Sequence, residues 1–83
     1  MKFEIFTLHS GNCYIGIGHK QFDREVAKYL NLTTNEYTDI LKQHKASINS
    51  ISCDGEYKFK NERDAKRAIK VLEPYLIMAE LTR

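Results

Sequence analysis

Residues 24–43, REVAKYLNLTTNEYTDILKQ, carry the strongest structural signal in the sequence. Two stripes of apolar residues have helical spacing. The first begins at Phe22, just before this stretch, and continues with Val26, Tyr29 and Leu30. The second contains Tyr37, Ile40 and Leu41. Between the stripes lies Asn31, a residue that tolerates the left-handed conformation in which many helices end. We therefore predict two consecutive helices, over residues 21–30 and 33–45.

The start of the second helix has its own local signal. Thr33 can cap the helix, and Glu36 follows three residues later, which is the spacing of a capping box. Lys42 and Lys45 lie near the predicted C-terminal end, where positive charge suits the helix dipole. These signals favour a helix that begins directly after a short turn.

On the N-terminal side, the sequence predicts a β-hairpin. Residues 1–8 alternate in a strand-like pattern, and Cys13–Ile17 repeats apolar residues at every second position. Residues 9–12, HSGN, are typical of a turn.

On the C-terminal side, a second hairpin is predicted from residues 47–52 and 56–60. A two-residue loop, Asp54-Gly55, is the usual connection for such a sequence. A three-residue loop over residues 53–55 puts the apolar side chains of both strands on one face, so we favour it.

A third helix is predicted after Asn61, which can cap it. Its expected buried stripe is Ala65, Ala68, Ile69 and Leu72. The two small alanines in this stripe suggest close packing on a sheet. Pro74 is expected to end this helix. Residues 75–81 then alternate as a last strand.

Together these elements predict one α+β domain over residues 1–83, in the order ββ-αα-ββ-α-β. We expect a largely antiparallel sheet with the helices packed on one face. The chain has 83 residues, of which 42% are hydrophobic and 29% charged, which excludes a collagen-like or disordered protein.

The helix pair resembles the helix-turn-helix family of DNA-binding motifs. That motif needs a small residue where the two helices approach each other, and Ala27 is at that position. Asn31 takes the place of the usual turn glycine. The apolar positions of the motif are filled by Val26, Leu30, Leu32, Tyr37, Ile40 and Leu41. A plain helical hairpin laid over the sheet satisfies the same pattern, so both interpretations stay open.

The resemblance implies that the second helix enters the major groove of DNA. The side chains expected to face solvent and to read bases or phosphates are Thr34, Asn35, Thr38 and Lys42, with Lys45 beyond them. Two features depart from the family pattern. Asp39 places a carboxylate on this helix, and a hairpin precedes the motif where the family has a helix.

A basic ridge on the third helix is the second candidate site. Arg63, Lys66, Arg67 and Lys70 share one helical face. The net charge is only +2, but residues 41–83 hold nine basic and six acidic residues. The ridge suits a DNA backbone, an acidic protein partner or simple solvation.

Catalysis is not expected, because no nucleophile motif, phosphate loop or paired carboxylates occur at a known spacing. Gly16-Ile17-Gly18 is more typical of close packing than of phosphate binding. No metal-binding spacing links the candidate ligands His9, Cys13, His19, His44 and Cys53. We therefore predict a non-enzymatic binding protein without a cofactor.

The remaining features bear on partners and location. The first choice of partner is duplex DNA; the alternative is a protein bound or inhibited through surface tyrosines and the ridge.

The last predicted strand is apolar on both faces, which suits either a central strand or a homodimer through Leu76 and Met78. With two cysteines and no apolar segment of membrane-spanning length, a cytoplasmic protein is expected.

Overall fold

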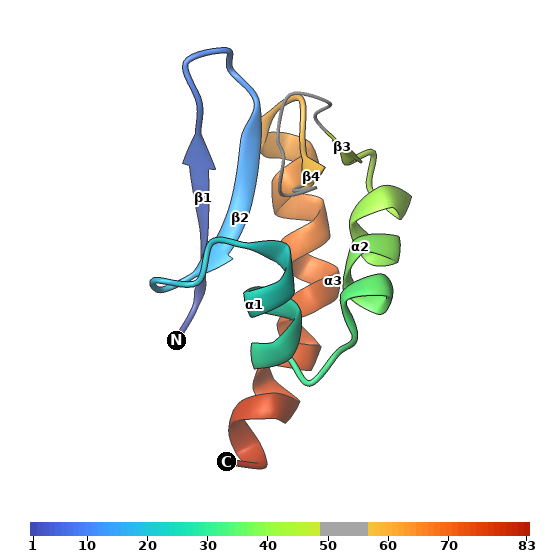
Figure 1. Cartoon of the computed structure of the whole chain (residues 1–83). Helices are drawn as coiled ribbons and strands as arrows, with labels where there is room; N and C mark the ends of the chain where they lie inside the picture. The colour runs from blue at the N-terminus through green and yellow to red at the C-terminus, as the bar shows by residue number, and fades with distance from the viewer. Residues whose placement is uncertain (49–56) are drawn as a thin grey trace.

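The computed structural model describes residues 1–48 and 57–83, and it confirms the predicted α+β class (Figure 1). The elements in these ranges are β1 (Phe3–Thr7), β2 (Cys13–Ile17), α1 (Asp23–Tyr29), α2 (Thr34–Gln43), β3 (Ser47–Ile48), β4 (Tyr57–Lys58) and α3 (Glu62–Leu81). The long helix α3 contacts β1, β2 and α2, so it connects the hairpin to the helix pair.

The N-terminal hairpin forms as the alternation predicts. β1 and β2 are antiparallel, with Phe3 opposite Ile17 and Ile5 opposite Ile15. These side chains share the inner face, where Ile15 and Ile17 are almost fully buried. On the outer face, the rings of Phe6 and Tyr14 stack with centroids 5.0 Å apart.

The second hairpin is shorter than predicted in the described residues. β3 and β4 pair antiparallel, with Ser47 opposite Lys58. One bridge joins this pair to the first hairpin: Cys13 and Phe59 exchange backbone hydrogen bonds of 2.8 and 2.7 Å. The predicted loop at residues 53–55 lies outside the described residues.

The predicted last strand is wrong. Residues 75–81 continue α3, and Pro74 lies inside the helix. The reason is a stripe of helical period that crosses the proline without interruption. Its members are at most 5% exposed: Ala65, Ala68, Leu72, Leu76 and Ala79. Burial of this stripe outweighs the single backbone hydrogen bond that proline removes.

The end of α3 is also fastened to α1. The hydroxyl of Tyr29 donates to Oε2 of Glu80 at 3.1 Å. The guanidinium of Arg83 lies over the Tyr29 ring, 3.9 Å from its centroid, and donates to the Tyr29 carbonyl. These contacts hold the last turns of α3 in a helical position that no local sequence signal indicates.

The turn between α1 and α2 has the left-handed residue and the capping box that the sequence predicts. Asn31 is left-handed, with φ of 58°. The Thr33 N–H donates to Oε1 of Glu36 at 2.9 Å, and the Glu36 N–H donates to Oγ1 of Thr33 at 3.1 Å, so the capping box is confirmed. Phe22, expected on the buried stripe, instead precedes α1 and is 48% exposed.

Tyr37 is the largest fully buried side chain, and its hydroxyl has no hydrogen-bond partner in the described part of the chain. Burial, together with the nearby Asp23 carboxylate, raises the pKa of this tyrosine well above its usual value. The hydroxyl therefore stays neutral. Its removal from water costs free energy that no hydrogen bond within the described residues offsets.

Tyr37→Phe is expected to raise the free energy of unfolding by about 1 kcal/mol, because it removes an unpaired polar atom without changing the ring. Urea denaturation measures the change. Tyr29→Phe is the matched control, and it is expected to destabilise because the Tyr29 hydroxyl is paired with Glu80. A loss of stability in Tyr37→Phe equal to that in the control would contradict the assignment.

Candidate nucleic-acid interface

A tight turn joins α1 to α2. Ala27 is 1% exposed, and its carbonyl accepts a hydrogen bond of 2.9 Å from the N–H of Leu32, beyond the turn. Because Ala27 is almost fully buried, a larger side chain at this position would have to displace its neighbours. The tight turn and the small residue were both predicted, and both are present.

The polar residues expected to read DNA differ in exposure. Thr34 and Asn35 are exposed at the start of α2. Thr38 is only 8% exposed, and its hydroxyl donates to the Asn35 carbonyl at 3.2 Å, so the prediction that it faces solvent is wrong. Thr38 directly follows Tyr37 and lies one turn before Leu41, and all three are buried, so the buried face of α2 is wide enough to include Thr38.

The charged residues on the exposed part of α2 are mixed in sign. Lys42 lies 3.6 Å from Oδ1 of Asp39 and 5.6 Å above the ring of Tyr57. Both members of the ion pair are more than half exposed, so the pair contributes little to stability and leaves Lys42 able to exchange partners. Lys45 comes just after α2 in the left-handed region, with φ of 69°, and is exposed.

Glu36 adds negative charge at the N-terminus of α2. The hydrogen bond that its carboxylate accepts from the Thr33 backbone is the main cause of a lowered pKa, so Glu36 is ionised at neutral pH. This carboxylate and Asp39 would both repel DNA phosphates. Glu36 therefore makes the N-terminal half of α2 a poor backbone-binding surface, whereas Asp39 lies in the C-terminal half, beside Lys42.

The basic ridge of α3 is open to solvent along its length. Its four members, Arg63, Lys66, Arg67 and Lys70, are all exposed. Within the described ranges, Arg67 alone among them lies near a carboxylate, at 4.0 Å from Oδ1 of Asp64. Asp64 also takes part in the capping hydrogen bond at the start of α3, in which its N–H donates to Oδ1 of Asn61 at 2.9 Å.

The fold separates the predicted site residues into two groups. α2 and α3 are in contact and run in opposite directions (Figure 1). Lys42 and Lys45, at the end of α2, therefore lie toward the end of the domain where α3 begins, and we call these two lysines and the α3 ridge the cationic end. Thr34 and Asn35 lie at the other end of α2, about 15 Å away along its axis.

The remaining candidates from the sequence are the potential metal ligands, the two cysteines and the glycines at residues 16 and 18. No group of three potential metal ligands occurs among the described residues. The Cys13 side chain is buried, with its Sγ 3.7 Å from Oγ1 of Thr7, while Cys53 lies outside the described ranges. Gly16 and Ile17 belong to β2, and Gly18 lies in the turn that two backbone hydrogen bonds of 2.9 Å close between Ile17 and Lys20.

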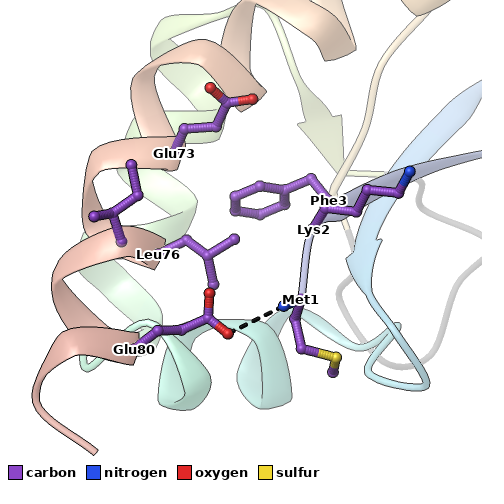
Figure 2. A pocket seen from close by; sticks show the side chains of 7 residues that line it. Met1, Lys2, Phe3, Glu73, Leu76 and Glu80 are labelled. Atoms are coloured by element: carbon purple, nitrogen blue, oxygen red, sulfur yellow. Dashed lines mark hydrogen bonds and ion pairs between the residues drawn. The ribbon is translucent and has the colours of Figure 1, made fainter.

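One feature that sequence reasoning missed is a pocket of about 200 Å³ between β1 and the end of α3 (Figure 2). The Met1 amino group lies 3.2 Å from Oε2 of Glu80 at its rim. That hydrogen bond is the main cause of the lowered pKa of Glu80. Phe3 and Leu76 form its apolar wall. Its volume is below the range of ordinary small-molecule sites. Sequence patterns did not reveal the pocket, because the residues that line it are far apart in the sequence.

The tyrosines do not gather into one exposed surface. Tyr37 is fully buried, and Tyr14, Tyr29 and Tyr57 are half-buried. Tyr75 is 41% exposed, on α3.

No family model, curated protein or solved structure matches this chain. Among the described residues, no helix combines the length and apolar character needed to span a bilayer. The chemistry of the exposed side chains is therefore the basis for assigning a function.

Proposed function

We propose that the protein is a small, non-enzymatic DNA-binding module that contacts the phosphate backbone of duplex DNA through its cationic end. The observation that carries this proposal is the exposure of all four ridge residues of α3 on one helical face. Lys42 and Lys45 are also exposed, at the end of α2 that lies toward the start of α3.

Backbone contacts account for most of the expected affinity. Each lysine or arginine that neutralises a phosphate releases a counterion, so binding weakens steeply as salt is added. Base reading is expected to be weak, because Thr38 is buried and Thr34 and Asn35 lie far from the cations. The proposal is therefore a module with substantial backbone affinity and little sequence preference of its own.

The proposal is tested by measuring duplex DNA binding by fluorescence anisotropy across a salt series. Lys66→Ala combined with Lys70→Ala is expected to weaken binding about tenfold or more and to reduce the log–log salt slope by about 2, because two phosphate contacts are lost. Alanine favours helix, so α3 should keep its structure.

The matched control combines Lys2→Ala with Lys28→Ala, which removes the same charge from exposed lysines outside the cationic end. It is expected to change the affinity less than about threefold. Equal weakening in the two double variants would mean that only net charge matters. Absence of binding at about 50 mM salt would refute the proposal and favour an acidic protein as the partner of the ridge.

A further inference from the structure

The solvent side of α3 changes character halfway along the helix. The basic ridge occupies its first half, whereas the second half exposes an apolar surface. Five large side chains there are 40–74% exposed: Val71, Tyr75, Ile77, Met78 and Leu81. We call these five residues, together with exposed Pro74, the apolar patch. Exposed apolar patches on a small protein commonly mark an interaction surface.

The ridge and the apolar patch lie on the same side of α3. Residues three or four positions apart share a face of a helix. Steps of this size lead from the ridge into the patch without a break: Arg63, Arg67, Lys70, Pro74, Met78 and Leu81. All six are exposed, whereas the buried stripe of α3 packs against the rest of the domain. The solvent side of α3 is therefore one continuous surface, cationic at its start and apolar at its end.

The carboxylates of α3 lie off this surface. Glu62, Glu73 and Glu80 are separated by eleven and seven residues, so they share another side of the helix. Glu73 and Glu80 line the pocket beside β1, where the Met1 amino group lies 3.2 Å from Glu80 (Figure 2). The fourth carboxylate, that of Asp64, belongs to a residue only 9% exposed. Cations and apolar side chains therefore face solvent together, with the acidic groups to one side.

We infer that this surface of α3 binds the face of a lipid bilayer rich in anionic lipids, with the apolar patch inserted among the headgroups. Charge complementarity argues for this occupant, because ridge cations are attracted to anionic headgroups while the adjoining apolar side chains reach the acyl boundary. The long stems of lysine and arginine allow their charges to stay at the headgroups. Duplex DNA offers phosphates but no apolar surface to cover the patch, so this inference goes beyond the proposed function.

The arrangement of α3 in the domain suits contact with an extended surface. The helix has 20 residues and is therefore about 30 Å long. It contacts β1, β2 and α2, and its opposite side is exposed from Arg63 to Leu81. Arg83, exposed two residues after Leu81, adds a cation at the apolar end. Both ends of the surface can therefore contact anionic headgroups.

The homodimer predicted through Leu76 and Met78 depended on a C-terminal strand. That strand does not form, because residues 75–81 are helical, and Leu76, at 5% exposure, belongs to the core. Met78 is 62% exposed on the solvent side of α3, where it is free to insert into a bilayer.

Vesicle co-sedimentation tests the inference with phosphatidylcholine alone and with phosphatidylcholine containing about 30% phosphatidylserine. The wild-type chain is expected to bind the anionic vesicles about 100-fold or more tightly, because each cation near an anionic surface strengthens binding about fivefold. Met78→Gln combined with Leu81→Gln should weaken that binding about 30-fold or more, because two apolar side chains no longer insert. Glutamine favours helix, so α3 should keep its structure, which circular dichroism checks.

Phe22→Gln is the matched control, because it removes an apolar side chain that is 48% exposed outside α3. It should change vesicle binding less than about twofold. Duplex DNA binding by the same variants, measured in parallel by fluorescence anisotropy, keeps this inference separate from the proposed function. The glutamine double variant should lose vesicle binding and keep its affinity for DNA.

Fluorescence tests insertion directly, because the chain contains no tryptophan. The emission of Met78→Trp is expected to shift to the blue on addition of anionic vesicles, and that of Phe22→Trp to stay unchanged. Absence of binding to anionic vesicles at about 50 mM salt would overturn the inference, whether or not DNA is bound. Equal vesicle binding by wild type and the glutamine double variant would also overturn it, since the ridge alone would then account for adsorption. A dimer in sedimentation equilibrium that the double variant abolishes, without vesicle binding, would assign the patch to a second copy instead.

Discussion

Gly16→Ala is expected to lower the free energy of unfolding by about 3 kcal/mol, a large part of the stability of so small a domain. A Cβ atom at Gly16 would lie 2.6 Å from the backbone carbonyl oxygen of Lys20 and 3.1 Å from a ring carbon of Phe6. The carbonyl cannot move aside, because Lys20 is held by two backbone hydrogen bonds to Ile17. Either the turn opens or β2 shifts away from it.

Thermal unfolding measures this effect, with a fall in Tm of about 15 °C expected for Gly16→Ala. His19→Ala is the matched control, because it changes an exposed side chain in the same turn and should leave the Tm within a few degrees. If Gly16→Ala unfolds like wild type, β2 and the turn after it cannot be packed as closely as described.

Pro74→Ala is expected to raise the free energy of unfolding by about 2 kcal/mol. Proline in a helix interior costs about 3 kcal/mol relative to alanine, and part of that cost is offset because proline also restricts the unfolded chain. Pro74 is exposed in the middle of α3, so the substitution leaves no cavity. The alanine N–H can restore the missing hydrogen bond to the carbonyl of Lys70.

The increase should appear as a rise in Tm of about 10 °C. Glu73→Ala, at the neighbouring exposed position, is the control and is expected to have a small effect. A lower Tm for Pro74→Ala would be the result expected if residues 75–81 formed a strand after all. The measurement therefore also tests the principal correction to the predicted fold.

Much of the fold was predictable because its signals are local. The alternation of Cys13–Ile17, the capping box of Thr33 and Glu36, and the left-handed Asn31 each depend on a few neighbouring residues. Such signals fix where an element begins or ends, whatever packs against it later.

The candidate site was predictable only in part. The α3 ridge needed nothing beyond helical periodicity and is exposed as expected. The burial of Thr38 depends on what surrounds α2 in the folded domain, and residue spacing within the helix did not reveal it. The pocket beside Met1 and Glu80 joins residues from the two ends of the chain, so no sequence window contains its signal.

Local sequence patterns are enough to place the hairpin, the helix pair with its turn, and a cationic face at the start of α3. The conformation of residues 75–81 depends instead on tertiary packing. A proline and an alternating segment indicate a break and a strand locally, but burial of Leu72, Leu76 and Ala79 on one helical face outweighs them. That burial moves Ile77 and Met78 from the predicted sheet to an exposed face of α3, because burying one side of a helix leaves the opposite side in solvent.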